Sequence, residues 1–172
     1  MNILAMIERP DSGKIHVLGE SVLVMENESA HRLRDGAIGY LFTHRHLLPS
    51  FTVAENIAMP YLRHRGNSIE LAGDGISEVL AFSGLPISSA NLAVANLSEE
   101  SLWRVAFARS VVHYPKILVA VSPPPDFLLP LAHAHARATG MAVLWNSGDT
   151  TAIGTYHRLL TSETTENLEI KE

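Results

Sequence analysis

The 172-residue sequence contains no cysteine, which excludes a disulfide framework and a thiolate metal site and favours a reducing compartment. Only 13 Lys and Arg residues stand against 18 Asp and Glu residues, giving a formal net charge of -5. Nucleic-acid binding relies on a basic surplus, so this balance argues against a nucleic-acid partner. No apolar run reaches the ~18 residues that span a bilayer, and the first residues lack the basic start of a secretory signal. We expect a cytoplasmic protein that is peripheral to a membrane at most.

Hydrophobic residues make up 47% of the chain and charged residues 18%, a balance typical of one compact domain with a substantial core. Short apolar runs bounded by turn residues predict four strands. These runs are 15–18, 38–42, 117–121 and 141–145. The last two show no alternation of apolar and polar residues, which is typical of strands covered on both faces by helices. The pattern therefore predicts an α/β fold with a parallel sheet.

Helical patterns lie between these strands and end at residues that stop helices. They cover 69–82, 98–113 and 128–139. We interpret 43–66, which is rich in His, Arg and Pro, as a surface excursion from the sheet. The polar tail 161–172 is expected to fray.

Paired histidines raise the possibility of a metal site at His44 and His46. No cysteine and no third ligand accompanies them, so we expect no metal. His133 and His135 are two apart on a predicted helix, point away from each other, and are expected to be solvated or helix-capping. Asp126 and Asp149 lack a neighbouring nucleophile and are expected to have surface or capping roles.

The helix predicted over 98–113 carries two arginines and two aromatic residues. Arg104 and Arg109 either bind a partner's phosphate or pair with Glu99, Glu100 or Asp126, and we favour the structural pairing. Trp103 and Phe107 are four residues apart, a spacing that favours packing over a ligand platform.

Five segments follow one another in an order that resembles the ATP-binding subunits of ABC transporters, over most of the chain. They are 2–20 (NILAMIERPDSGKIHVLGE), 38–62 (IGYLFTHRHLLPSFTVAENIAMPYL), 97–121 (LSEESLWRVAFARSVVHYPKILVAV), 141–149 (MAVLWNSGD) and 156–160 (YHRLL). They are similar, in turn, to the helix and strand after the phosphate-binding loop, the Q-loop strand with the start of the helical subdomain, the signature helix with the Walker B strand, the switch-histidine strand and the next core strand. The wording of the second segment is most similar to lipoprotein-release and related division or efflux ATPases.

This resemblance implies an incomplete P-loop NTPase fold of three layers, with a parallel core sheet and a helical subdomain insertion at about 50–113. The whole of 1–172 would form a single truncated domain. The chain contains no G-x-x-x-x-G-K-[ST] motif, the loop whose backbone surrounds phosphates and whose Lys and Ser or Thr serve the outer phosphates and Mg²⁺. The similarity begins just after the place of that loop.

The resemblance also locates four catalytic positions of the family, and this chain departs from the family at each. Thr43 stands in place of the Q-loop Gln, Val121 and Ser122 in place of the Walker B Asp and Glu, and Gly148 in place of the switch His. A valine holds no metal shell, and a serine is a poor base for activating water. From these departures we predict no cofactor and no ATP hydrolysis.

The signature motif L-S-G-G-Q of the family is matched here by Leu97-Ser98-Glu99-Glu100-Ser101. Ser98 is predicted to N-cap the following helix, and two carboxylates in the first turn favour the helix dipole. The same carboxylates would repel a triphosphate. We therefore expect this surface to reject ATP.

One surface keeps a functional interpretation by resemblance, because in the family the region after the Q-loop receives the coupling helix of a membrane permease. The residues are Leu47, Leu48, Pro49, Ala54, Glu55 and Asn56. Their apolar groove either docks a helix or only packs the join between the helical subdomain and the sheet, and the sequence leaves both open.

Our leading hypothesis is a non-catalytic pseudo-subunit that binds or regulates a permease or an intact ATPase, as a hetero-dimer in the second case. The alternative is a split or truncated ATP-binding subunit of lipoprotein-export type whose phosphate loop comes from a partner, or a non-functional remnant.

Overall fold

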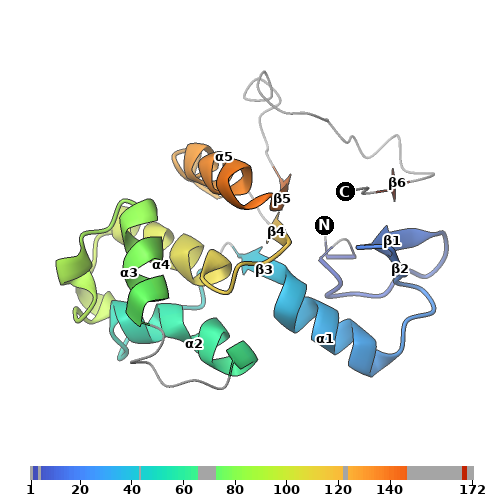
Figure 1. Cartoon of the computed structure of the whole chain (residues 1–172), viewed down its shortest axis with the longest axis horizontal. Helices are drawn as coiled ribbons and strands as arrows, with labels where there is room; N and C mark the ends of the chain where they lie inside the picture. The colour runs from blue at the N-terminus through green and yellow to red at the C-terminus, as the bar shows by residue number, and fades with distance from the viewer. Residues whose placement is uncertain are drawn as a thin grey trace.

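The structure, a computed structural model, describes residues 2–3, 5–42, 44–65, 73–121, 124–146 and 168–169. At its centre is a parallel sheet of three strands in the order β3 (Ile38–Leu41), β4 (Ile117–Ala120) and β5 (Ala142–Trp145) (Figure 1). Ile38 pairs with Ile117, which in turn pairs with Ala142. The strands predicted over 38–42, 117–121 and 141–145 are therefore confirmed, and so is their parallel arrangement.

The central strand β4 is buried on both faces. Leu118 and Ala120 belong to one hydrophobic cluster, whereas Ile117 and Val119 belong to a second cluster on the opposite face. All four side chains are almost completely inaccessible. Successive side chains of a strand point to opposite faces, so a run without alternation means that both faces are covered, as the sequence predicts.

Helices cover the first face of the sheet. They are α2 (Val53–Arg65), α3 (Gly73–Phe82), α4 (Glu99–Val111) and α5 (Leu128–Thr139), with two short 3-10 helices between α3 and α4, η1 (Ile87–Ser89) and η2 (Val94–Asn96). Figure 1 shows α2, α3 and α4 grouped together to one side of the sheet. Phe107 of α4 is fully buried, and the cluster around it draws on all four α-helices.

The second face is covered by the N-terminal part of the chain. Its elements are β1 (Ile15–Val17), β2 (Glu20–Ser21) and α1 (Asn27–Ala37). The strands β1 and β2 form an antiparallel hairpin through Leu18 and Gly19, both with positive φ as in a type I′ turn. The short strand β6 (Leu168–Glu169) pairs parallel with β1, so these two residues of the tail join a sheet, and the rest of 161–172 lies outside the described residues.

Two local predictions are wrong, and one helix was not predicted. The stretch 43–66, interpreted as a surface excursion, contains α2, whose Val53 and Ile57 are fully buried. The helix α1 was not predicted, because it has no fully buried residue and therefore no apolar stripe to reveal it. The first residues, which resemble a helix of the family, form turns closed by a hydrogen bond from the Met6 amide to the Ile3 carbonyl.

The ends of the other helices agree with their sequence signals. The helix α5 covers 128–139 as predicted and ends at Gly140, whose φ of 74° permits the left-handed cap. The helix α3 ends at Phe82, before Gly84 with its φ of 72°. The predicted start of that helix, 69–72, lies outside the described residues.

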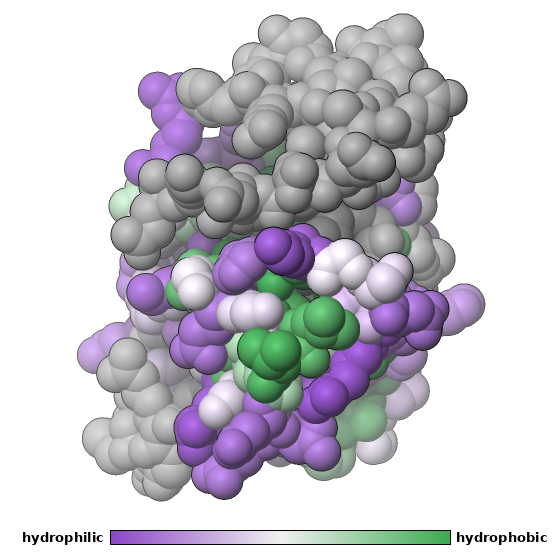
Figure 2. Space-filling view, turned by 90° about the vertical axis from the view of Figure 1, so that its right-hand side faces the viewer, coloured by the Kyte–Doolittle hydropathy of each residue, from purple (hydrophilic) through white to green (hydrophobic). Residues whose placement is uncertain are grey.

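An apolar patch bordered by hydrophilic residues faces the viewer in Figure 2, on the end of the molecule that carries β1 and β2. In the connection from β2 to α1, Leu23 is 40% and Val24 78% exposed. Among the described helices, none is both long and apolar enough to cross a membrane.

Candidate nucleotide and partner site

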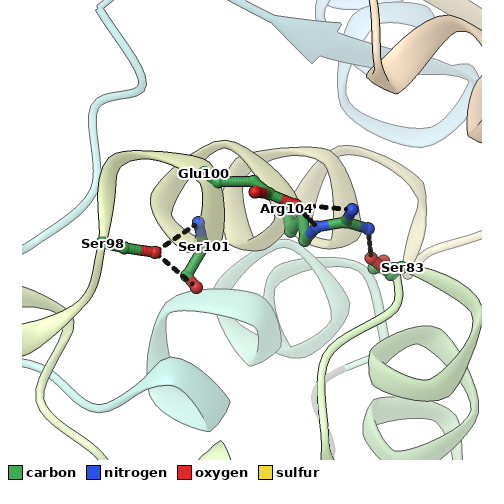
Figure 3. A network of polar contacts seen from close by, with 5 residues as sticks. All are labelled: Ser83, Ser98, Glu100, Ser101 and Arg104. Atoms are coloured by element: carbon green, nitrogen blue, oxygen red, sulfur yellow. Dashed lines mark hydrogen bonds and ion pairs between the residues drawn. The ribbon is translucent and has the colours of Figure 1, made fainter.

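The first turn of α4 carries the residues that match the family's signature motif. Ser98 is the N-cap, and its Oγ accepts a hydrogen bond of 3.3 Å from the Ser101 amide and donates one of 3.0 Å to the Ser101 hydroxyl (Figure 3). The predicted N-cap is confirmed. Leu97, just before it, is half-buried against the main core, so the motif is anchored by an apolar residue and ordered by a serine.

Glu100 is paired with Arg104 one turn further along α4. The guanidinium donates hydrogen bonds of 3.0 and 2.8 Å to one carboxylate oxygen and a third, of 2.7 Å, to the Ser83 carbonyl (Figure 3). The structural pairing favoured for Arg104 is confirmed. Because Ser83 follows α3, this side chain also joins the end of α3 to the first turns of α4.

Glu99 is paired with Arg45, which comes from the segment after β3. The guanidinium of Arg45 also lies over the Trp103 ring, 5.2 Å from its centroid. The hydrogen bond from Arg45 holds the pKa of the Glu99 carboxyl below its ordinary value. Both carboxylates of the signature position therefore have a cationic partner. The predicted repulsion of a triphosphate rested on the negative charge of the two carboxylates alone. The two guanidinium groups offset that charge.

Arg109 does not pair with Glu99, Glu100 or Asp126, so that part of the prediction is wrong. Instead it donates to the carbonyl oxygens of Arg45 and His46, the latter at 2.7 Å. Burial lowers the pKa of its guanidinium. A guanidinium presents several donors in a fixed fork, which allows one side chain to hold two consecutive carbonyl groups.

The predicted docking residues divide into exposed and supporting ones. Leu48 is 37% exposed and Pro49 is exposed, whereas Leu47 and Ala54 are half-buried against the core. Asn56 is fully buried. Its side chain accepts a hydrogen bond from the Leu48 amide at 2.8 Å and donates to the Leu48 carbonyl at 3.1 Å, so its role is to support the loop.

Glu55 also has a structural role. Its carboxylate accepts from the Thr52 amide at 2.8 Å, and the Thr52 hydroxyl accepts from the Glu55 amide at 3.2 Å. This reciprocal pair is a capping box, T-x-x-E, at the start of α2. The hydrogen bonds from Thr52 lower the pKa of Glu55. The capping box is also the sequence signal that would have predicted α2.

Sequence reasoning missed two exposed apolar residues on segments that backbone hydrogen bonds tie to the loop of Leu48. Phe51 is 39% and Leu92 49% exposed. The two segments are tied together, because the Val94 amide donates to the Phe51 carbonyl at 3.1 Å and the Phe51 amide to the Leu48 carbonyl at 3.0 Å. We call Leu48, Phe51 and Leu92 the docking surface. Only the tertiary structure brings Leu92 to it.

Of the four family positions that depart from the catalytic pattern, only Val121 is described. It directly follows β4, and its amide donates to the Leu41 carbonyl at 3.0 Å. Thr43, Ser122 and Gly148 lie outside the described residues, as does Asp149. Their departures from the family stay predictions.

The histidines differ in their surroundings. His44 and His46 are exposed, with ring centroids 6.5 Å apart. Within the described part of the chain, no three His, Asp or Glu side chains are grouped to hold a metal. His135 is only 7% exposed, so the expectation of a solvated residue is wrong. It packs against the Phe82 and Phe107 rings, because α5 turns this side toward the core.

The aromatic residues of α4 pack as predicted. Trp103 is 8% exposed, and Phe107 is fully buried. Asp126 lies on the surface after β4, as expected.

The sequence pattern of the family described as "ABC transporter" matches residues 1–123. The chain belongs to the ABC transporter family. The lipoprotein-releasing system ATP-binding protein LolD of Bdellovibrio bacteriovorus is 34% identical over 123 residues, which are 72% of this chain and 55% of that protein. LolD 2 of Caulobacter vibrioides is 35% identical over 118 residues, 69% of this chain and 51% of that protein. The chain spans about half the length of these curated relatives.

Solved ABC ATPase cassettes share the fold. A dimeric structure of the ATP-binding cassette MJ0796 superposes with a TM-score of 0.75 at 24% identity, covering 87% of this chain and 68% of that one. CbiO1 from Clostridium perfringens, part of an ABC transporter complex, gives 0.74 at 18% identity, covering 86% and 61%. The α/β cassette fold inferred from the resemblance is confirmed.

The prediction that this ABC transporter protein lacks ATP hydrolysis is wrong. The family that matches is described as "ABC transporter", the LolD relatives are ATP-binding proteins by name, and the ATP-binding cassette MJ0796 has also been captured in a post-hydrolysis state with ADP and Pi. The prediction rested on departures from the family at four single positions, of which the structure describes only Val121.

Proposed function

We propose that this chain is an ATP-binding subunit of an ABC transporter of the lipoprotein-releasing type. The observation that carries the proposal is the similarity to LolD proteins over 123 residues. The family match covers residues 1–123, which contain both the first turn of α4 and the docking surface. The subunit would couple ATP hydrolysis to movement of a membrane permease.

The first turn of α4 would face the phosphates of ATP held by a second subunit. The amides at a helix N-terminus attract anions, and the helix here keeps the signature serine as Ser98. The pairs Glu99 with Arg45 and Glu100 with Arg104 keep this end from presenting unbalanced negative charge. These residues would orient phosphate and take no part in bond breaking.

The phosphate-binding loop would come from a separate polypeptide or from the remainder of a longer protein, because these 172 residues contain no such motif. A Gly-rich loop with Lys and Ser or Thr supplies the phosphate cradle and the Mg²⁺ ligand. ATP hydrolysis would then take place in a site shared between that loop and the first turn of α4.

The docking surface would receive a helix of the permease, and the subunit would then lie at the cytoplasmic face of the membrane. Leu48, Phe51 and Leu92 offer apolar area, and an amphipathic helix binds such a surface through apolar side chains on one face. Below them, the buried Asn56 fixes the loop that carries Leu48.

Site-specific photo-crosslinking in native membranes tests the docking. A photoreactive residue at position 51 or 92 should give a product with a permease subunit. The matched control is position 24, because Val24 is more exposed than either but lies at the β1–β2 end of the molecule. Equal products at all three positions, or none at 51 and 92, would contradict the docking.

ATP turnover by the complex recovered with the tagged chain tests the enzymatic part. We expect Mg²⁺-dependent hydrolysis that is lost on Ser98→Trp, which places a bulky side chain at the start of α4. Hydrolysis should be kept on Ser12→Trp, at an exposed loop position before β1. A complex that contains the permease but never hydrolyses ATP would refute the ATPase assignment while leaving the docking intact.

A further inference from the structure

Arg45 is held between two residues of α4 that lie one turn apart. Its guanidinium is paired with the Glu99 carboxylate and lies 5.2 Å from the centroid of the Trp103 ring. Residues four apart lie on the same face of a helix, so Glu99 and Trp103 bracket the cation. The Arg45 side chain is 24% exposed and Trp103 is buried, whereas the Glu99 side chain is 71% exposed. The guanidinium is therefore partly shielded from water by the Trp103 ring, and the carboxylate faces the solvent.

The backbone of the same segment is held by α4 at a second place. Arg109 donates to the carbonyl oxygens of Arg45 and His46. His46 has a φ of 49°, a left-handed conformation that costs a non-glycine residue free energy and persists where the surroundings enforce it. The Arg45 side chain thus attaches the segment to α4, and the Arg109 side chain attaches α4 to the backbone of the same segment.

The segment is also attached to α2. Asn56 bonds both the amide and the carbonyl of Leu48. Residues 45–48 are therefore joined to α4 and α2 by side-chain hydrogen bonds, although they follow β3 in the sequence. Meanwhile the other end of α4 packs closely on β3, where a methyl group at Gly39 would lie 2.1 Å from the Ser110 carbonyl oxygen.

We propose that Arg45 is a positioning residue that fixes the first turn of α4 relative to the segment leaving β3. We call Arg45, Glu99, Trp103 and Arg109 the clamp. Because of it, a displacement of the segment after β3 moves the signature residues as well. This inference rests on the proposed function, since it assigns the clamp to the orientation of Ser98 toward ATP. Arg45 itself would not touch the nucleotide.

Hydrogen exchange of the full chain tests the clamp directly. The amide of Leu102 is bonded to the Ser98 carbonyl at 2.9 Å and reports on the first turn of α4. We expect Arg45→Ala and Glu99→Ala each to raise its exchange rate about two- to fivefold, and the double variant to raise it no further, because coupled residues are non-additive. Arg32→Ala is the matched control, because it removes an Arg–Glu pair on α1.

Trp103 fluorescence gives a second readout that does not depend on exchange. In a Trp145→Phe background, Arg45→Ala should shift the emission of Trp103 to longer wavelength, because water replaces the guanidinium over the ring. Arg45→Lys keeps the charge without the planar group and should restore part of the wild-type signal. Additive exchange effects, an equal effect of Arg32→Ala, or an unmoved emission would each overturn the clamp.

ATP turnover by the intact complex then tests the positioning role. We expect Arg45→Ala to lower kcat while the KM for ATP stays within about twofold, as for an interaction that matters only in the transition state. A raised KM with unchanged kcat would mean that Arg45 binds nucleotide and would overturn the proposal. If the wild-type complex does not hydrolyse ATP, the proposed function fails, and exchange and fluorescence still decide whether the clamp exists.

Discussion

Replacing Asn56 by alanine should lower the free energy of unfolding of this protein more than substitution of any exposed residue near it. Asn56 is fully buried and makes three hydrogen bonds, two to Leu48 and one of 2.9 Å to the Thr52 carbonyl. Each such bond contributes about 0.5–1.5 kcal/mol net. The three together give an expected loss of about 2 to 4 kcal/mol, a large part of the ~5–15 kcal/mol that stabilises a typical domain.

Urea unfolding followed by far-UV circular dichroism measures this loss. The midpoint should fall with an unchanged slope, because the surface exposed on unfolding stays the same. Asn91→Ala is the matched control at an exposed position and should change the free energy of unfolding by less than about 0.5 kcal/mol.

A second variant separates the hydrogen bonds from the lost volume. Asn56→Asp keeps the size and the acceptor for the Leu48 amide but loses both donors and sets a carboxylate against two carbonyl oxygens. It should destabilise more than Asn56→Ala near neutral pH, and less as the carboxyl is protonated. The reasoning is refuted if Asn56→Ala costs under about 1 kcal/mol, or if Asn56→Asp is the milder of the two.

Further substitutions test packing and pH dependence. Gly39→Ala should destabilise by at least about 2 kcal/mol, because its methyl group would meet the Ser110 carbonyl oxygen at 2.1 Å. A methyl group at Gly36 on α1 would have no atom within 4 Å, so Gly36→Ala should stabilise the protein by about 1 kcal/mol. Equal shifts of the melting temperature in the two variants would contradict the close packing at Gly39. Burial lowers the pKa of His135 from 6.5, opposed by Glu78, so the unfolded chain binds more protons just below pH 6.5 and stability falls as the pH is lowered. In His135→Leu, the urea midpoint should fall less between pH 7 and 5 than it does in the wild type. An equal fall in both proteins would show that this histidine does not contribute to the pH dependence of stability.

Local signals predicted much of the fold. The unbroken apolar run of β4 indicates a strand covered on both faces, and the structure buries its two sides in separate clusters. Ser98 predicts the start of α4, and Gly140 predicts the end of α5. Each of these signals acts within a few residues, through hydrogen bonds or backbone conformations that the side chain itself favours. The capping box of Thr52 and Glu55 is a signal of the same kind that was overlooked.

Other features depend on residues far apart in the sequence. The docking surface gains Leu92 only because backbone hydrogen bonds tie residues 51–54 to residues 90–94. His135 sits on a helix correctly predicted in extent, yet its burial depends on the neighbouring aromatic rings of α3 and α4. The sequence shows which residues favour a helix, but it does not show which side of that helix will be covered.

The sequence by itself determined the strands of the central sheet, the caps of α4 and α5, and the resemblance that led to the family. The tertiary structure alone decided the partners of Arg45 and Arg109. Arg45 and Glu99 are 54 residues apart, and no periodicity links them. Ion pairs at such separations form only after β3 and α4 have packed, because the attraction between two solvated charges is too weak and too strongly screened to select a partner in the unfolded chain.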